Sequence, residues 1–334
     1  MQIFNKKRLP LHTDYNKNHI NDMNESISFS FIMPAYKAQY LNLAIESILN
    51  QSYKDFELII VNDASPENLK DIVDCYNDDR IIYKENERNI GGTDLVANWN
   101  QCIQYAQYKY IVLATDDDTY EPDFLFEATT LIKKYPDVNL FRSGVKKIGE
   151  QGQILDIEFS LKEYMNSREF TLCWAKGLTI SCVSNYIFKK DALIAMGGFI
   201  SFPHAHFSDD ATALSMANHG VACISKNCMN FRVSDINLSN QGDFHIAIQQ
   251  IRATDEYMSW FVSHVAILDT NKEDFFERAC YGGCKNRYIS LLEKLLSKIP
   301  VKRFYIAIRT IYSMKHLFRN EKLKLSAYYL LNKL

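Results

Sequence analysis

The sequence predicts an α/β protein with a mostly parallel sheet flanked by helices. Short apolar segments alternate with segments whose apolar residues recur every three to four positions, the pattern of buried strands alternating with amphipathic helices. The apolar segments end in polar residues, as strands do at the ligand-binding edge of such a sheet. The 334 residues are 47% hydrophobic and 23% charged, which is enough apolar material for a sizeable core.

The predicted strands are short apolar runs bounded by turn residues. The first ends where Pro34 follows Met33, and the second ends at the turn sequence Asn62-Asp63-Ala64-Ser65-Pro66. In chain order, the predicted strands are 29–33, 56–61, 81–83 and 110–114.

Four helices are expected between and after these strands, because their apolar residues repeat with helical period. The third begins after Gly91-Gly92, where Thr93 and Asp94 are candidate caps. In chain order, the predicted helices are 40–50, 67–76, 93–106 and 124–135.

Composition changes along the chain and suggests a division into parts. Residues 1–27 are polar and are expected to form a leader. Residues 28–240 are the expected α/β domain, with a strand–helix half (28–135) and a half with scattered strands and shorter helices (136–240). Residues 241–334 are expected to form a helical, basic extension.

Net charge and cysteine content limit the possible partners and the cellular compartment of the protein. The net charge of −2 gives no polyanion-binding signature, so nucleic acid is not expected as a partner. The eight cysteines lack the paired spacing of a zinc site or a disulfide framework, which favours a reducing cytoplasm. The sequence contains no secretory signal and no apolar run long enough to span a bilayer, so we expect a cytoplasmic or peripheral protein.

Asp116-Asp117-Asp118 follows the strand 110–114 and is the sharpest chemical feature. Adjacent carboxylates repel one another unless a cation compensates. Mg²⁺ or Mn²⁺ binds one or two carboxylates together with phosphate oxygens. The triplet therefore suggests a metal–diphosphate site, and a solvated acidic turn is the equally weighted alternative.

Polar residues after the first two strands suggest a nucleotide site. Asp63 suits a ring N–H donor such as uracil, with Tyr36 or Pro34 packed on the ring, although an Asx turn explains Asp63 as well. Asn89 begins a segment, Asn89-Ile90-Gly91-Gly92, whose backbone N–H groups could hold a phosphate or a sugar hydroxyl. It is neither a dinucleotide fingerprint nor a P-loop.

A second acidic pair, Asp209-Asp210, precedes a helical stretch that ends at Gly220. Ser208 or either acid could cap that helix, and the remaining acid suits a general base for an acceptor hydroxyl. Upstream, Gly198 and Phe199 lie in a flexible turn that could approach a bound sugar. His204 and His206 flank this segment and could assist acceptor binding or reach the metal, although a surface-loop role is favoured. Trp174 is expected to lie in the core.

Taken together, these segments resemble the inverting family 2 glycosyltransferases of the GT-A fold. Met33-Pro34-Ala35-Tyr36 is similar to the family's first strand, which ends in Pro-x-Tyr beside the nucleotide. The resemblance continues through 44–53, 56–65, Asn89-Ile90-Gly91, the DxD-like 114–118, Gly197-Gly198-Phe199 and 208–210. It covers roughly residues 28–235.

The resemblance implies transfer of a sugar from a nucleotide-diphospho-sugar, UDP in preference to others, to a glycan or lipid-linked hydroxyl, as in cell-surface polysaccharide assembly. It implies nucleotide contacts from Pro34, Ala35, Tyr36, Asp63, Asn89 and Asp116. Because Thr115 replaces the first acid of the DxDD pattern, Asp117 with Asp116 would hold Mn²⁺ or Mg²⁺. Asp210 or Asp209 would be the base, and Gly198 and Phe199 would lie on the acceptor side. The alternatives are a non-catalytic nucleotide-sugar-binding or scaffold protein and a nucleotidyltransferase.

Residues 285–334 carry twelve Lys or Arg against Glu293 and Glu321. Within them, 301–319 mixes cations with large apolar side chains, which is typical of a basic helix that lies on an anionic membrane. The alternative is a helical subdomain packed on the body with its cations in solvent.

Overall fold

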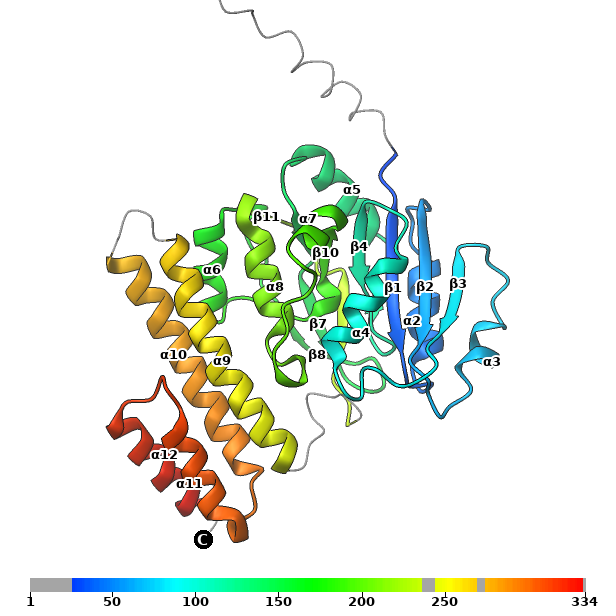
Figure 1. Cartoon of the computed structure of the whole chain (residues 1–334). Coiled ribbons are helices and arrows are strands. Elements are labelled where there is room, and N and C mark those ends of the chain that lie inside the picture. The colour runs from blue at the N-terminus through cyan, green and yellow to red at the C-terminus, as the bar shows by residue number, and fades with distance from the viewer. Residues whose placement is uncertain (1–25, 236–243, 269–273, 333–334) are drawn as a thin grey trace, which may run out of the picture.

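The computed structural model describes residues 26–235, 244–268 and 274–332. The predicted leader therefore lies almost entirely outside the described residues, and so does the predicted boundary at 240. The α/β prediction is confirmed: a mostly parallel sheet is flanked by helices, and further helices follow it (Figure 1).

The larger sheet has the spatial strand order β3-β2-β1-β4-β10-β6-β11-β9. The first four of these strands are parallel to one another, with Phe29 of β1 opposite Phe56 of β2 and Tyr110 of β4. β10 runs antiparallel to both of its neighbours. The bounds are β1 (Phe29–Ala35), β2 (Phe56–Asn62), β3 (Ile81–Glu85), β4 (Tyr110–Leu113), β6 (Leu140–Arg142), β9 (Tyr164–Met165), β10 (Tyr186–Lys189) and β11 (Val221–Cys223).

The smaller sheet has the order β5-β12-β7-β8. β5 directly follows the acidic triplet, and its partner β12 begins far along the chain, so this sheet fixes the segment that leaves the triplet. Its bounds are β5 (Thr119–Tyr120), β7 (Val145–Ile148), β8 (Ile154–Ile157) and β12 (Met229–Arg232).

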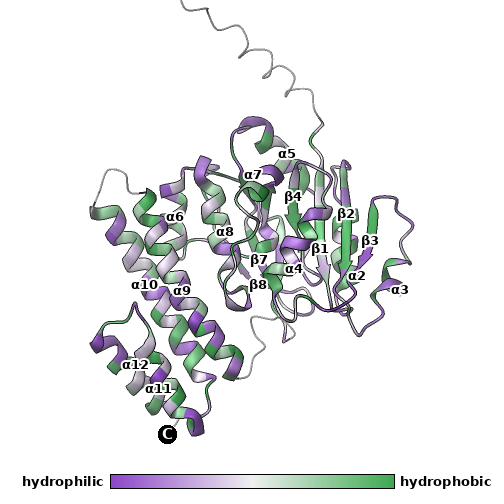
Figure 2. Ribbon diagram, in the orientation of Figure 1, coloured by the Kyte–Doolittle hydropathy of each residue, from purple (hydrophilic) through white to green (hydrophobic). Residues whose placement is uncertain are grey.

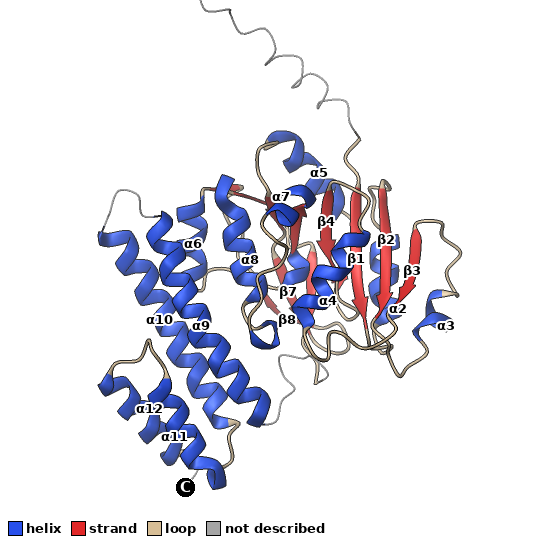
Figure 3. Cartoon of the chain, viewed as in Figure 1, coloured by secondary structure: helices blue, strands red, loops and turns tan. Residues whose placement is uncertain are grey.

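Helices cover both faces of the larger sheet (Figure 3). Alternate residues of β1 separate the two cores: Phe29, Phe31 and Met33 pack with α2 and α5, whereas Ile32 belongs to the core that includes α4. This alternation follows from the two-residue period of a strand. The helices of this part are α2 (Leu41–Leu49), α3 (Leu69–Val73), α4 (Leu95–Cys102), α5 (Phe124–Lys134), α6 (Ser167–Ala175), α7 (Lys190–Ala195) and α8 (Ser208–Met216).

The C-terminal part is helical, as predicted, and it shares a core with the sheet. Met258 and Phe261 of α9 and Cys284 of α10 are buried in the same cluster as Ile32. Alternating apolar and polar residues on these helices are visible in Figure 2. In the described part of the chain, no helix combines the length and the apolarity needed to cross a membrane. The bounds are α9 (Phe244–Leu268), α10 (Asp274–Ser297), α11 (Phe304–Ser313) and α12 (Arg319–Leu331).

Two predicted boundaries were wrong in an informative way. β1 continues past Pro34 to Ala35, because beyond Ile32 only β2 pairs with it and the missing N–H of proline can lie on the open side. The helix predicted over 67–76 is shorter, spanning Leu69–Val73, and begins where Asn68 accepts a hydrogen bond from the Asp71 backbone N–H.

The strand order places an opening beside β1. The chain builds outward from β1 through β2 to β3 and then returns to β4 on the other side of β1. In such sheets the crevice for a ligand lies outside the carboxyl ends of the strands where the order reverses. The carboxyl ends of β1 and β4 carry Pro34 to Lys37 and Ala114 to Asp118.

Candidate functional site

A first cavity of about 300 Å³ lies at these strand ends. It brings together all of the residues predicted to contact a nucleotide or a metal: Pro34, Ala35, Tyr36, Asp63, Asn89, Asp116 and Asp117. The sheet explains this convergence, because parallel strands deliver their carboxyl ends to one edge. The Tyr36 residue is 39% exposed, so its ring has room to accept a stacked base.

Asp116 holds the segment after β1. Its Oδ2 accepts the backbone N–H groups of Tyr36 at 2.7 Å and Lys37 at 2.8 Å. Burial outweighs these two bonds and, with the charge of Asp117, raises the pKa of the Asp116 carboxyl to about 6. Asp116 therefore shapes the cavity wall in addition to lining it.

Asp63 is anchored to the segment after β3. Its Oδ1 accepts the Asn86 side-chain amide at 2.7 Å and the Ile90 N–H at 2.9 Å, and its Oδ2 accepts the Gly91 N–H at 2.7 Å. A Cβ on Gly91 would lie 2.8 Å from Asp63 Oδ2, so this close approach requires glycine. Oδ2 keeps acceptor capacity for one further donor, because a carboxylate oxygen has two lone pairs.

The acidic triplet divides into three environments. Asp118 is buried, and its carboxylate accepts the Thr115 hydroxyl at 2.7 Å, the Ser184 hydroxyl at 2.9 Å and the Arg232 N–H at 2.9 Å. Burial raises the pKa of Asp118 to about 7. Asp118 therefore ties β12 and the segment around Ser184 to the end of β4.

Asp117 lines the first cavity with 8% of its surface exposed. Burial raises the pKa of its carboxyl. The Arg232 guanidinium donates to the Asp117 carbonyl oxygen at 2.9 Å and lies 4.4 Å from the Tyr40 ring. These contacts hold the backbone of the triplet in place.

A second cavity of about 480 Å³ adjoins the first. Gly91, Trp99, Thr115 and Phe231 line both cavities. Asp209 and Asp210 line only the second. Asp116 and Asp117 therefore lie in one cavity and Asp209 and Asp210 in the adjoining one, while Asp118 lines both.

Asp209 and Asp210 differ in their partners. Asp210 is buried and its Oδ1 accepts the Trp174 indole N–H at 2.6 Å, whereas Asp209 is half-buried and its Oδ1 accepts the Asp210 backbone N–H at 2.9 Å. Burial and the charge of Asp210 raise the pKa of Asp209 to about 7. Burial also raises the pKa of Asp210, against the opposing effects of the Arg287 charge and of hydrogen bonds from Ser181 and Trp174.

The helix cap predicted here was wrong. α8 begins at Ser208 after Phe207, which has a left-handed φ of 68° and makes no side-chain cap. The Ser208 hydroxyl instead accepts the Phe202 N–H at 3.1 Å. Both acids therefore lie in the first turn, where the helix dipole favours negative charge.

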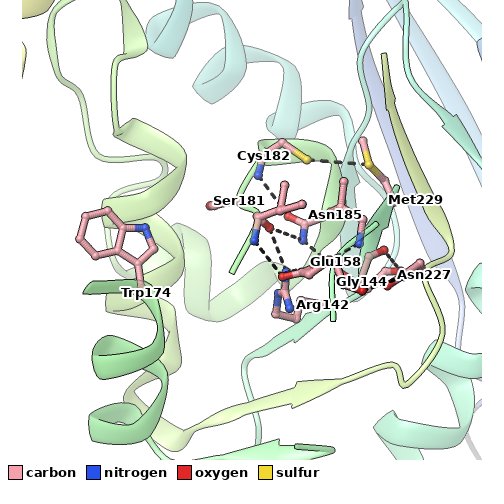
Figure 4. A network of polar contacts seen from close by, with 12 residues as sticks. Arg142, Gly144, Glu158, Trp174, Ser181, Cys182, Asn185, Asn227 and Met229 are labelled. Atoms are coloured by element: carbon pink, nitrogen blue, oxygen red, sulfur yellow. Dashed lines mark hydrogen bonds and ion pairs between the residues drawn. The ribbon is translucent and has the colours of Figure 1, made fainter. Parts of the chain in front are cut away.

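A buried ion pair supports the wall of the second cavity (Figure 4). Glu158 accepts Arg142 Nη2 at 2.9 Å and the backbone N–H of Ile180 at 2.8 Å. Ile180 precedes Ser181 and Cys182, which line the cavity. The network holds Ile180 beside the cavity, and removing either partner of the pair would leave an uncompensated buried charge.

Gly198 and Phe199 are not among the described residues that line the two cavities. Asn100 holds their turn, because its side-chain Oδ1 accepts a hydrogen bond from the Phe199 backbone N–H at 2.7 Å. The Phe199 ring packs at 5.5 Å against Trp99, which does line both cavities. Their connection with the site therefore runs through Trp99.

Sequence reasoning missed two site residues, and for a third, His206, it favoured a surface loop over acceptor binding. His206, expected in a surface loop, lines the second cavity, and so does Gln250 of α9. Arg287 of α10 lies 4.2 Å from the Trp174 ring and donates to the Trp174 carbonyl oxygen. No sequence signal marked Gln250 and Arg287, because they come from helices that fold back onto the site.

The carboxylate oxygens of the first cavity suit a divalent cation that also binds a ligand. Within the described residues, no three His, Cys, Asp or Glu side chains are grouped as a metal site. Asp117 and Asp116 supply hard carboxylate oxygens at the edge of the first cavity. These residues fit Mg²⁺ or Mn²⁺ completed by phosphate oxygens.

Comparison with known proteins gives consistent results. The sequence model of glycosyl transferase family 2 matches residues 30–197. An uncharacterised glycosyltransferase of Methanocaldococcus jannaschii is 38% identical over 141 residues, which are 40% of this chain and 47% of the archaeal protein. This chain thus matches about half the length of that relative.

Two further comparisons extend over more of the chain. A Bacillus subtilis glycosyltransferase, provisionally assigned to teichuronic acid biosynthesis, is 27% identical over 202 residues, or 59% of this chain and 75% of that protein. The crystal structure of TarS 1-349 from S. aureus in complex with UDP-GlcNAc has a TM-score of 0.60 at 16% identity, covering 92% of this chain and 89% of that one. At this identity the likeness shows the fold.

Proposed function

This protein belongs to glycosyl transferase family 2, whose sequence model covers half of the chain, and we propose that it is a metal-dependent, inverting glycosyltransferase. The donor is a nucleotide-diphospho-sugar, with UDP as the preferred nucleotide, and the acceptor is a hydroxyl of a glycan or a lipid-linked glycan in cell-surface polysaccharide assembly. In this proposal residues 28–135 bind the donor and 136–240 the acceptor.

One observation carries the proposal: two adjoining cavities each contain their own acidic group and share one wall. Asp116 and Asp117 line one cavity, and Asp209 and Asp210 line the other. A donor whose diphosphate lies beside Asp117 would have its sugar at the shared wall. An acceptor hydroxyl beside Asp209 would then approach from the opposite side.

In the reaction, the acceptor oxygen forms a bond to the anomeric carbon as the bond from that carbon to the diphosphate oxygen breaks. The electron pair of the broken bond leaves with the diphosphate, and the hydroxyl proton passes to Asp209. Asp209 suits this role because its pKa of about 7 keeps a large unprotonated fraction at neutral pH. Asp210, bonded to Trp174, positions it.

A divalent cation held by Asp117 and Asp116 would supply positive charge beside the diphosphate. Tyr36 and Pro34 would pack against the base, with Ala35 and Asn89 in the same wall, and the remaining lone pair of Asp63 Oδ2 would accept an imide N–H. The imide occurs in uracil and thymine, which favours UDP and dTDP over GDP.

Donor binding is the direct test of this proposal. With Mn²⁺ present, a UDP-sugar at roughly 100 times its Kd should stabilise the native state by about 2.7 kcal/mol, which differential scanning fluorimetry detects as a raised Tm. The shift should be lost in EDTA and should be absent with UMP, which lacks the diphosphate. A product assay with pooled glycan acceptors follows.

The outcomes separate the candidate functions. Binding with transfer supports the glycosyltransferase, and binding without any turnover favours a scaffold. No shift with UDP-, dTDP- or GDP-sugars would contradict both. Pyrophosphate release from a nucleoside triphosphate and a sugar phosphate would instead indicate a nucleotidyltransferase.

We further propose that the protein works from the cytoplasmic face of an anionic membrane and contacts it through α11. Ala307 and Ile311 of this helix are buried, so it packs on the body as one sequence alternative expected. Tyr305, Arg309 and Tyr312 are exposed at helical spacing on its other side. All eight cysteines are free thiols, which suits a reducing compartment.

Reversing two exposed cations of this region, with Arg309→Glu and Lys315→Glu together, should weaken binding to phosphatidylglycerol vesicles by roughly 30-fold or more. Each cation near an anionic surface contributes about 1 kcal/mol. Co-sedimentation measures the effect, with Lys133→Glu and Lys176→Glu on the body as a matched control. Equal binding of both variants would contradict contact through this region, and equal binding of the native protein to phosphatidylcholine would contradict the preference for an anionic membrane.

A further inference from the structure

The second cavity has a wall that lies beyond the family match at residues 30–197. His206 contributes to it from the segment before α8, and Gln250 from α9. Gln250 is 5% exposed. Neither residue is needed for binding a donor or for accepting the proton in the proposed reaction.

Both side chains present a buried polar atom without a partner. Among the described residues, His206 Nε2 and Gln250 Oε1 have no hydrogen-bond partner. A buried polar group left unpaired costs free energy, and such groups are rare in folded proteins. Four other buried side-chain atoms of the described residues also lack a partner, but they belong to residues outside this cavity: Arg80, Arg142, Thr179 and Tyr257. Because the two atoms of His206 and Gln250 belong to residues that line one cavity, we read them as groups kept for a ligand.

The backbone of the same wall is also unusual. His204, Ala205 and Phe207 have left-handed φ angles of 55°, 54° and 68°. Non-glycine residues adopt this conformation only where the surrounding structure imposes it, and such residues cluster at ligand sites. Here the Phe207 ring is fixed by stacking on Tyr257 at 4.4 Å.

The chemistry of the wall selects a class of ligand. Burial lowers the pKa of His206 to about 4, so its ring is neutral and Nε2 either donates or accepts, depending on the tautomer. Gln250 Oε1 only accepts. A hydroxyl both donates and accepts, so it satisfies either atom. The described lining of this cavity contains Asp118, Asp209 and Asp210 but no Lys or Arg, which disfavours an anionic ligand. Lys298 and Lys294 act on His206 from outside this lining.

We propose that His206 and Gln250 form a subsite for a neutral, hydroxyl-bearing sugar unit of the acceptor. Gln250 Oε1 accepts a hydrogen bond from one hydroxyl, and His206 Nε2 pairs with another. Trp99 and Phe231 supply apolar surface for the C–H groups of the ring. The subsite rests on the proposed glycosyltransferase function and adds to it that the acceptor is an uncharged glycan.

The test compares Gln250→Leu and His206→Phe with the native protein. The probes are neutral p-nitrophenyl glycosides of glucose, galactose, mannose and N-acetylglucosamine, with the glucuronide as the anionic probe. Binding is measured by saturation-transfer NMR and titration with UDP and Mn²⁺ present. Each variant should raise the Kd of the neutral glycoside that binds by about threefold to tenfold.

Two controls keep structural damage apart from lost binding. Gln249→Leu changes the exposed neighbour on α9 and should leave glycoside binding unchanged. UDP binding should be native in every variant. The Tm of Gln250→Leu without ligand should equal or exceed the native value, because the substitution removes an unpaired buried polar atom; a merely structural glutamine would give a lower Tm.

The outcomes separate this subsite from the proposed function. If UDP and the UDP-sugars fail to bind the native protein, the proposed function is wrong and the subsite falls with it. If UDP binds but no neutral glycoside does, the subsite is wrong. The same conclusion follows if the glucuronide binds as well as the neutral probes, or if both variants bind glycosides like the native protein.

Discussion

Replacing Asp209 with asparagine should lower kcat for sugar transfer by about 10²- to 10⁴-fold, the usual contribution of a general base. Asparagine fills the same space and its Oδ1 still accepts the Asp210 N–H, but it takes up no proton. Donor binding should be unchanged, because Asp209 lines only the second cavity. Initial rates with a UDP-sugar, together with UDP titration, measure both.

The pH dependence gives a sharper result than the rate alone. The pKa of Asp209 is about 7, raised by burial and by the charge of Asp210. Below pH 7 the carboxyl is protonated and no longer accepts a proton, so native kcat/KM should fall tenfold per pH unit on the acid side. The Asp209→Asn variant should lose this limb.

Asp210→Asn is the matched control. Its Oδ1 still accepts the Trp174 N–H, and removal of the negative charge lowers the pKa of Asp209, so the acid limb should move to lower pH while much of the rate remains. A reversed result, with Asp209→Asn active and Asp210→Asn inactive, would make Asp210 the base. Full activity in both variants would remove the pair from the chemistry.

The fold was predictable because its strands are apolar on both faces. The run 56–61 became β2 almost unchanged, since a buried parallel strand needs no alternation of polar residues. The first cavity followed from the same logic. Polar residues after β1, β2 and β4 meet at one edge once those strands are parallel.

Contacts made by distant helices could not be predicted in the same way. The sequence predicts helices after residue 241, but it does not show what those helices pack against. In the sequence, Gln250 and Arg287 are therefore indistinguishable from other polar helix residues. In the structure, Gln250 lines the second cavity and Arg287 contacts Trp174. Lys285 likewise counted as a surface cation, whereas it is buried and pairs with Glu321 at 3.0 Å.

Replacing Asp117 with asparagine should abolish the Mn²⁺-dependent part of UDP-sugar binding and lower transfer by about 10³-fold or more. A cation beside a leaving diphosphate contributes several kcal/mol to the transition state, and each 1.36 kcal/mol is a factor of ten. Calorimetric titration of UDP with and without Mn²⁺ measures the binding. Exposed Asp137→Asn is the control and should behave as the native protein.

Comparison with Asp118→Asn separates a metal ligand from a structural carboxylate. Asp117 raises the pKa of both neighbouring acids, so removing its charge relieves repulsion and the Tm without ligand should stay equal or rise. Asp118 accepts hydrogen bonds from the Thr115 and Ser184 hydroxyls and from the Arg232 backbone N–H. In Asp118→Asn the side-chain NH₂ group would face one of these donors, so the Tm should fall. If Asp117→Asn instead lowers the Tm and still binds UDP with full Mn²⁺ dependence, Asp117 belongs to the framework and the cation must be held elsewhere in the first cavity.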